Sequence, residues 1–186
     1  MTDSGFQLSS PQEDRLVGVH QRQADGSLKP IAVDIPPRHP EFWGGGGALY
    51  STGPDYLAFL RMLLGNGQFG QARLLRPETV REIGRNQVGD LTAGEMHSVM
   101  PERTNDFILF PDGSARWGLA YMINTKPGPF GRSAGSLSWG GIFNSYYWID
   151  PAKRVAAVIL TQLLPFADPR VLALYGAFER ALYDMA

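Results

Sequence analysis

Cysteine is absent from this chain of 186 residues. Its absence excludes disulfide bonds, thiolate zinc sites and a cysteine nucleophile together, and it leaves the redox compartment open. Histidine is scarce as well: His20, His39 and His97 do not have the spacing of metal ligands, and the acidic residues around them are scattered. We therefore expect no metal and no other cofactor.

An excess of either charge is also missing. The 17 Lys and Arg residues nearly balance the 18 Asp and Glu residues, which gives a formal net charge of −1. No field of the whole molecule would attract nucleic acid or an anionic membrane surface. The expected partner is a small molecule that is roughly neutral.

Long apolar runs are missing too. The longest, Val155 to Leu160, has the length of a strand and falls far short of the roughly 20 residues that span a bilayer. Met1 to Ser10 carry no positive charge, and no apolar run typical of a signal peptide follows them. We expect a soluble chain without a membrane span. The lack of a signal favours the cytoplasm, although a fragment would carry no information about its parent.

The composition is that of a globular protein, with 44% hydrophobic and 19% charged residues. At this length the chain can form one well-cored domain or a large piece of a bigger one. We treat residues 1–186 as a single unit of α+β class, in which 1–115 form a loop and helical part and 116–186 form sheet strands and a C-terminal helix.

The first part of that unit predicts two helices between loops. Residues 1–42 are polar and rich in proline, which predicts extended chain with at most short strands around a turn at Asp25-Gly26. Thr52 is a helix cap, followed by leucines at helical spacing up to Gly65. Pro77 begins a second helix, which runs through Val80 and Ile83. Residues 87–113 predict a loose stretch.

The second part predicts an antiparallel sheet covered by one helix. Asp150 to Arg154 form a hairpin loop, and Asp168-Pro169 begins the last helix. Four segments rich in β-branched and aromatic residues predict strands: Trp117 to Ile123, Leu137 to Gly141, Asn144 to Ile149, and Val155 to Thr161. One face of the helix should cover the sheet with Val171, Leu174, Tyr175, Phe178 and Leu182.

Three stretches, taken in order, resemble one family of enzymes. They are Met1 to Phe6, then Gly46 to Thr52 followed by Asp55-Tyr56, then Ser138 to Gly141 followed by Tyr147 to Pro151. The set resembles the C-terminal portion of serine β-lactamases and penicillin-binding proteins, and within them the carboxylesterases related to class C β-lactamases. The resemblance implies a partial β-lactamase/transpeptidase-like fold and acyl hydrolysis through a serine ester.

The resemblance also implies where a substrate would lie. The family's third active-site motif is usually Lys or His, then Thr, Ser or Gly, then Gly, and here it would be Trp139-Gly140-Gly141. A Trp in the first position resembles the carboxylesterase branch and implies an uncharged small-molecule ester or amide. The backbone N–H of Ile142 would be one of two oxyanion-hole donors. From its pattern alone, Trp139 would be a core residue; the resemblance instead places it on a cleft wall.

The family's nucleophile and base motifs do not occur in these residues. Ser-x-x-Lys would need a serine three positions before Lys29, Lys126 or Lys153, and those positions hold other residues. Neither Tyr-x-Asn nor Ser-x-Asn occurs. The resemblance therefore implies a truncated hydrolase that is inactive alone. The resemblance also implies that the family's first strands are missing from this chain. The strand from Val155 to Thr161 would then form an open sheet edge that permits self-association.

Two alternatives stay open. The chain could be a binding or interaction module without catalysis on the same scaffold. Gly131 to Gly135 also matches Gly-x-Ser-x-Gly, but that nucleophile elbow needs a helix after it and a later histidine, and all three histidines come earlier. We interpret it as a glycine-rich loop, with a hydrolase using Ser133 as the competing hypothesis. Gly44 to Gly47 predict a tight turn and no phosphate site, because no Lys-Ser or Lys-Thr follows them.

Overall fold

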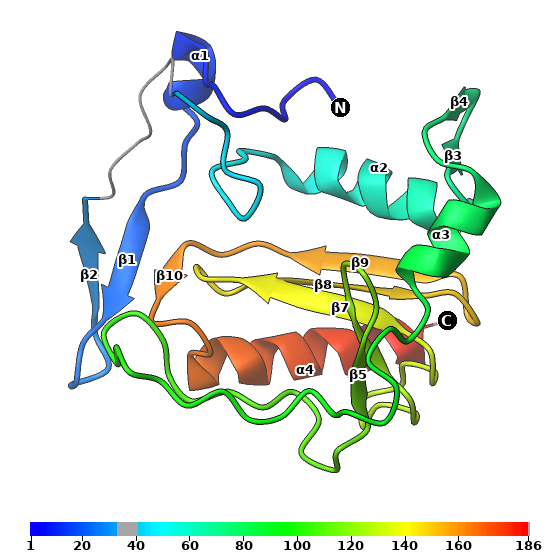
Figure 1. Cartoon of the computed structure of the whole chain (residues 1–186). Helices are drawn as coiled ribbons and strands as arrows, with labels where there is room; N and C mark the ends of the chain where they lie inside the picture. The colour runs from blue at the N-terminus through cyan, green and yellow to red at the C-terminus, as the bar shows by residue number, and fades with distance from the viewer. Residues whose placement is uncertain (33–40, 186) are drawn as a thin grey trace.

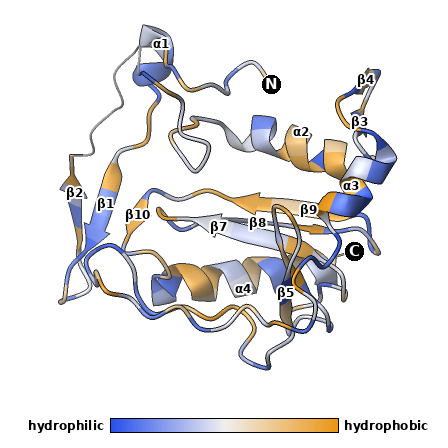
Figure 2. Cartoon of the chain, viewed as in Figure 1, coloured by the Kyte–Doolittle hydropathy of each residue, from blue (hydrophilic) through white to orange (hydrophobic). Residues whose placement is uncertain are grey.

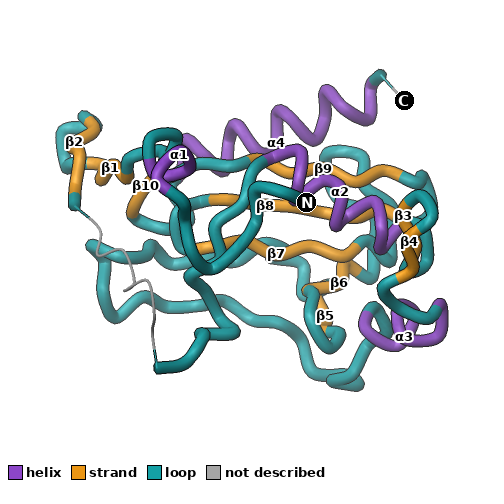
Figure 3. The backbone as a smooth tube through the Cα atoms, turned by 90° about the horizontal axis from the view of Figure 1, so that it is seen from above, coloured by secondary structure: helices purple, strands orange, loops and turns teal. Residues whose placement is uncertain are grey.

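The structure, a computed structural model, describes residues 1–32 and 41–185, so His39 lies outside the described residues. Its centre is an antiparallel sheet of five strands in the order β5, β6, β7, β8, β9. Helix α2 lies over one face of this sheet and helix α4 over the other (Figure 1). The strands are β5 (Ala115–Trp117), β6 (Met122–Asn124), β7 (Leu137–Gly141), β8 (Ser145–Asp150) and β9 (Val155–Ile159). Seen from above, they run side by side in that order (Figure 3).

Strand β8 divides the apolar side chains between two cores because successive residues of a strand point to opposite faces. Tyr146 and Trp148 belong to a cluster that includes Tyr175 of α4 (Pro169–Asp184). Ile149 belongs to the opposite cluster with Leu60 of α2 (Gly53–Leu64). Tyr147, between Tyr146 and Trp148, packs against the cluster of Leu60 and Ile149. Figure 2 shows hydrophobic residues on α2 and on β9, the strand that α2 packs against.

The predicted strand from Trp117 to Ile123 is wrong as a single strand. The chain turns back after Trp117, and β5 pairs antiparallel with β6. The turn is forced at Gly118, where a Cβ atom would lie 2.3 Å from the carbonyl oxygen of Ile83. Only glycine tolerates such a close approach between two backbones, so the strand has to end there.

The remaining predicted strands are found with small shifts at their ends. Strand β7 has the predicted bounds, β9 ends two residues early, and β8 starts one residue late. The late start follows from Asn144, whose φ of 61° belongs to a turn and not to a strand. The loop from Asp150 to Arg154 joins β8 and β9 as an antiparallel hairpin, as predicted.

Helix α4 begins as predicted, with the Asp168 side chain accepting hydrogen bonds from the amides of Arg170 and Val171. Its predicted apolar face is partly wrong. Val171 and Tyr175 are buried, but Leu174 points outward with 54% of its surface exposed. The place expected for an apolar residue is taken by Glu179, which is buried next to the sheet.

The helices of the first part are confirmed. Thr52 caps α2 through the amide of Asp55, and α2 ends at Gly65. Gly70 lies in the turn between the short strands β3 (Gln68–Phe69) and β4 (Ala72–Arg73), and α3 (Pro77–Ile83) follows. Residues 44–47 contain a turn in which the Gly47 amide donates to the Gly44 carbonyl at 3.5 Å.

A second, smaller sheet ties the beginning of the chain to its end. Strand β1 (Val19–Arg22) lies between β2 (Leu28–Ile31) and β10 (Leu163–Leu164), antiparallel to the first and parallel to the second. A single helical turn, α1 (Ser10–Glu13), precedes it. The prediction of at most short strands in this region is confirmed, since β1 and β2 have four residues each.

One edge of the large sheet is formed by β9, which pairs only with β8 among the described residues. The edge predicted to be open is therefore a terminal strand of the sheet. Within residues 1–32 and 41–185, no helix combines the length and the apolar character needed to cross a bilayer.

A buried ion pair joins the loop before β7 to α4. The Nε atom of Arg132 donates to Glu179 at 2.8 Å, and Nη2 donates to the Tyr175 hydroxyl at 2.8 Å. Both charged side chains are only 3% exposed. The guanidinium also lies over the Trp148 ring, 5.1 Å from its centroid. Each charge is tolerated in this core only because the other is present.

We predict that Arg132→Met lowers the free energy of unfolding by about 3–5 kcal/mol, because it leaves the Glu179 carboxylate buried without a partner. The double variant Arg132→Met/Glu179→Leu should recover most of that loss. Arg81→Met, which removes the exposed Arg81–Glu78 pair, is the matched control and should cost less than about 0.5 kcal/mol. Urea unfolding followed by tryptophan fluorescence measures all three, and additive losses in the double variant would contradict the account.

Candidate functional site

The residues predicted to line the substrate occupy the second half of β7. Strand β8 pairs with β7 along its whole length, up to Gly141 opposite Ser145. Strand β6 pairs only with Leu137 and Ser138. Trp139, Gly140 and Gly141 therefore have one strand edge without a neighbouring strand among the described residues. Backbone N–H and C=O groups on such an edge can pair with an extended ligand.

The two glycines of this edge have different roles. A Cβ atom on Gly140 would lie 2.7 Å from Cδ1 of Tyr146, so its lack of a side chain serves packing inside the protein. A Cβ atom on Gly141 would meet nothing within 4 Å. Gly141 thus leaves space on one face of the sheet, next to the free edge where the sequence predicts close approach of a substrate.

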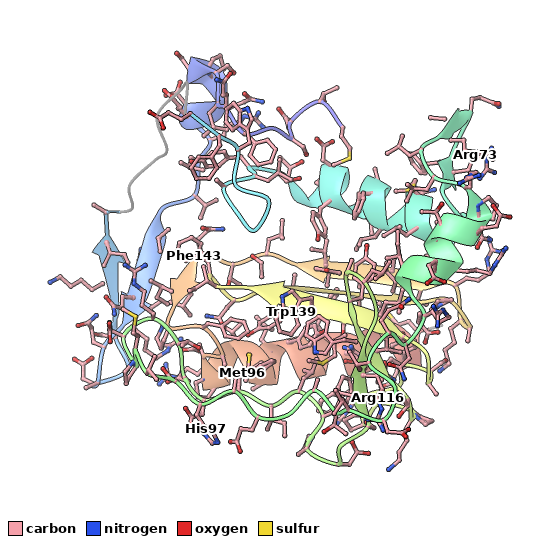
Figure 4. The ribbon with its side chains drawn as sticks, viewed as in Figure 1. Arg73, Met96, His97, Arg116, Trp139 and Phe143 are labelled. Carbon is pink, nitrogen blue, oxygen red and sulfur yellow. The ribbon has the colours of Figure 1, made fainter. Side chains whose placement is uncertain are left out.

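Trp139 is half-buried and packs against another tryptophan. Its ring lies 4.7 Å from the ring of Trp117 in an edge-to-face arrangement, beside the small cluster of Phe110, Ala115 and Met122. Figure 4 shows Trp139 near the middle of the sheet. The contact fixes the orientation of the indole, while the remaining exposed surface is available to a ligand.

Ile142 and Phe143 form the turn that follows the glycines. Ile142 is 49% exposed, and no hydrogen bond is donated by its amide to the described residues. The turn is closed by the Asn144 amide, which donates to the Gly141 carbonyl at 2.9 Å. Phe143 lies on the β10 side of the sheet (Figure 4), and its carbonyl accepts from Leu163 at 3.1 Å and from the Thr161 hydroxyl at 2.7 Å.

Asn144 fixes this turn to the rest of the fold, a role that sequence reasoning missed. The side chain is fully buried and makes four hydrogen bonds. Nδ2 donates to the carbonyls of Leu163 at 2.8 Å and Pro165 at 2.7 Å. Oδ1 accepts from the Tyr146 hydroxyl at 2.9 Å and the Asp168 amide at 3.0 Å. Every donor and acceptor of the amide group has a partner, which fixes the position of the turn beside β10 and α4.

The charges around this network keep its donors and acceptors in one state. Burial opposes ionisation of Asp168, but hydrogen bonds from the Arg22 guanidinium and the Val171 amide outweigh it and hold the pKa of that carboxyl below its usual value. Burial raises the pKa of Tyr146, so its hydroxyl remains a donor to Asn144. Arg22 lies on β1, and the network therefore includes the small sheet as well.

A weak signal for Asn144 exists in the sequence. Asparagine tolerates positive φ better than most residues. It follows two glycines and precedes a strand of alternating residues, and a hairpin turn is expected at such a place. Three of its four partners, in contrast, lie 19 to 24 residues later in the chain and cannot be inferred from local pattern.

The Gly-x-Ser-x-Gly segment is a loop between β6 and β7, as interpreted. It has a strand after it and no helix. The Ser133 amide donates to Oδ2 of Asp150 at 2.8 Å, and neighbouring Arg132 is held by Glu179. These contacts serve the structure of the loop and bring no histidine to Ser133 among the described residues.

One group of acidic residues around a histidine is closer than the sequence indicated. Ligand atoms of Glu95, His97 and Asp106 lie within 4.8 Å of one another, although the acids near the histidines look scattered along the chain. All three residues are exposed, and Oδ1 of Asp106 already accepts from the Ser98 amide at 2.7 Å. The group lies on the surface of the loop, and we assign no metal to it.

The first two of the three stretches that carried the sequence resemblance also meet in space. Gly5 and Tyr50 form an antiparallel bridge, with amide-to-carbonyl distances of 3.0 and 2.9 Å. The Ser4 hydroxyl donates to Asp55 at 2.9 Å. The opening residues and the start of α2 thus form one unit above the sheet (Figure 1).

Comparison with known proteins agrees with this geometry, because the sequence model of the Beta-lactamase family matches residues 1–182. The chain belongs to the Beta-lactamase family. Its fold is the C-terminal portion of the serine β-lactamase and penicillin-binding-protein fold, of hydrolase and acyltransferase type.

Three relatives of this Beta-lactamase family chain illustrate the match. Protein Rv1367c of Mycobacterium tuberculosis (strain ATCC 25618 / H37Rv) is 30% identical over 174 residues, covering 89% of this chain and 40% of the relative. Acyltransferase calJ of Penicillium decumbens is 28% identical over 172 residues, covering 89% and 39%. The LovD6 mutant of simvastatin synthase (LovD) from Aspergillus terreus has a TM-score of 0.77 at 25% identity, covering 98% and 46%. The chain spans about 40% of the length of the curated relatives it matches.

We predict that Asn144→Ala lowers the free energy of unfolding by about 3–4 kcal/mol, because it leaves several buried donors and acceptors without partners. Asn66→Ala is the matched control: Asn66 also has positive φ, 53°, but is exposed. It should lose only the backbone preference, about 1 kcal/mol. Chemical denaturation measures both, and equal losses would show that the Asn144 side chain contributes nothing.

We also predict that the two glycines of β7 respond differently to a methyl group. Gly140→Ala should destabilise the protein by about 1–3 kcal/mol because of the overlap with Tyr146. Gly141→Ala should change the free energy of unfolding by less than about 0.5 kcal/mol. The midpoints of urea unfolding compare them, and a Gly141→Ala variant that is the less stable of the two would refute the assigned roles.

Proposed function

We propose that this chain supplies the substrate-lining strand of a serine enzyme that transfers acyl groups from small, uncharged esters or amides. The observation that carries the proposal is the free edge of Trp139, Gly140 and Gly141, where β6 stops pairing and β8 continues. Family membership supports the chemistry. An extended acyl group can pair with this edge without displacing any part of the described fold.

In this proposal the backbone does the positioning. The amide of Ile142 is one of two donors to the oxygen that becomes negative when the ester carbonyl turns tetrahedral. Such donors act because they are already aimed at charge that develops in the transition state, and removing one typically costs 10²- to 10³-fold in rate. Asn144 is a positioning residue, since it holds the turn that carries this amide.

Trp139 defines the class of substrate. An aromatic ring stands where related β-lactamases have a cation for a substrate carboxylate, so an uncharged group should lie beside it. The Trp117 contact keeps the indole in one orientation, which gives the substrate a flat apolar wall.

The nucleophile and its base come from outside these 186 residues in the proposal. A serine hydroxyl attacks the ester carbonyl carbon and gives its proton to the base. The alcohol then leaves with a proton, and an acyl-serine ester remains. Attack by water completes hydrolysis, whereas attack by a second alcohol completes acyl transfer.

The test is turnover of p-nitrophenyl acetate by four samples: the chain alone, its Ser133→Ala variant, the chain fused behind the N-terminal portion of LovD that this chain does not cover, and that fusion with Gly141→Ala. We expect turnover only by the fusions, reduced by Gly141→Ala because a methyl group intrudes on the edge. Circular dichroism confirms folding of each sample. Turnover by the chain alone that Ser133→Ala abolishes would overturn the proposal.

A second candidate function is an interaction module without catalysis. It is favoured by β9, an edge strand that consists of Val, Ala and Ile. Natural edge strands avoid pairing by means of charged residues or proline, and β9 has neither. Sedimentation analysis tests it: a stable dimer together with a folded but inactive fusion would favour this function, and a monomer would exclude pairing through β9.

A further inference from the structure

A hollow lies beside the turn that carries the predicted oxyanion donor. It has a volume of about 470 Å³, is open to solvent, and is lined by the loop of residues 96–105 and by Ile142. This volume falls in the range of small-molecule sites in proteins, roughly 300–1,000 Å³. Because the same residue provides the donor and a wall of the hollow, a group attached to the reacting carbonyl can reach it.

The walls of the hollow are apolar side chains that the fold leaves uncovered. Met96 is 42% exposed, Met100 48% and Val99 93%, and they meet Ile142 at this point. Exposed apolar residues gathered in one place mark binding surfaces more often than isolated ones do. The two methionines are flexible and polarisable, which suits a ligand of variable shape.

The loop that forms these walls is fixed to the main fold. Met96 and Phe107 exchange backbone hydrogen bonds of 2.8 and 3.0 Å. The amide of Asn105 donates to Phe166 at 2.9 Å, and the amide of Phe166 donates to Arg103 at 2.9 Å. Phe166 lies between Pro165 and Asp168, two partners of Asn144. The loop and the turn are thus anchored on the same short segment, which keeps the hollow at a constant position relative to the β7 edge.

Polar residues of the loop, among them Arg103 and Thr104, also border the hollow, but most of the surface that faces it is apolar. His97 interacts with Asp106, with Nδ1 3.3 Å from Oδ2, and in Figure 4 its side chain leaves the loop on the side away from the sheet. Met96 extends from the loop in the opposite direction (Figure 4). The interior is therefore mostly apolar, and it favours a hydrocarbon group over a sugar, a phosphate or a charged peptide.

We propose that this hollow binds an unbranched alkyl chain of the ester substrate, and that Met96, Val99 and Met100 determine the preferred chain length. The assignment of the chain to an ester rests on the proposed function. Binding of the alkyl chain itself does not, because it requires only the hollow. Two sources are possible for such a chain, the acyl side and the alcohol side of the ester.

Binding is measured without catalysis, by NMR of the whole chain labelled with ¹³C in its methionine methyl groups. The sequence has six methionines, of which Met62 is a buried residue of α2 and Met185 lies at the end of α4. Methyl hexanoate carries the chain on the acyl side, hexyl acetate carries it on the alcohol side, and methyl acetate has none. We expect saturable shifts of Met96 and Met100 with a hexyl or hexanoyl ester, at least tenfold weaker binding of methyl acetate, and unmoved signals for Met62 and Met185.

Two variants distinguish binding in this hollow from nonspecific binding to exposed apolar residues. Val99→Asp should weaken binding of the six-carbon ester at least tenfold, whereas Leu74→Asp, a change at an equally apolar residue exposed elsewhere, should leave it unchanged. The tighter of the two six-carbon esters identifies the side of the substrate that enters. Shifts of Met96 and Met100 with an inactive fusion would support this inference while the proposed function fails. Turnover by the fusion without any such shift, or equal binding of methyl acetate, would overturn the inference.

Discussion

The side chain of Asn144 is the contact on which the candidate site depends. It donates hydrogen bonds to two carbonyls of the β10 segment. It accepts hydrogen bonds from the Tyr146 hydroxyl on β8 and from the amide of Asp168, the N-cap residue of α4. A sheet, a turn and a helix terminus thus share one amide group. Because every polar atom of this group is paired inside the protein, the turn has a single low-energy position. The free edge of β7 is held in place as well, because the turn begins directly after the last residue of that strand.

The same segment organises the hollow. Residues 163–168 form hydrogen bonds with the Asn144 side chain on one side and with the loop of residues 96–105 on the other. A site of this type needs rigid support more than it needs many polar groups, because its donors are backbone amides. Arg22 and Asp168 extend the support to the small sheet, and the buried Arg132–Glu179 pair joins α4 to the loop before β7. Polar contacts therefore set the geometry, and the two apolar clusters supply the stability.

Sequence pattern was sufficient where local chemistry decides the structure. Thr52, Gly65 and Asp168 mark helix ends through capping, and the alternation in β8 assigns its faces. Prediction from sequence pattern failed where a contact with a residue distant in the chain decides the local structure. Gly118 lies in a turn where the Ile83 backbone is against it. Leu174 is exposed, whereas Glu179 on the same helix is buried because it pairs with Arg132. The position of Trp139-Gly140-Gly141 on a strand was predictable, but the free edge and the hollow depend on where β6 stops and where a distant loop is anchored.

Amide hydrogen exchange on the whole chain tests the central claim most directly. The account requires a rigid turn with an available amide at Ile142. It predicts that the amides of Leu163 and Asp168, which are bonded to the turn, exchange only at the rate of global unfolding, whereas the Ile142 amide exchanges close to the rate of an unstructured peptide. Fast exchange at all three positions would show that the turn is not held, and strong protection at Ile142 would show that its N–H is already engaged and is not available as an oxyanion donor.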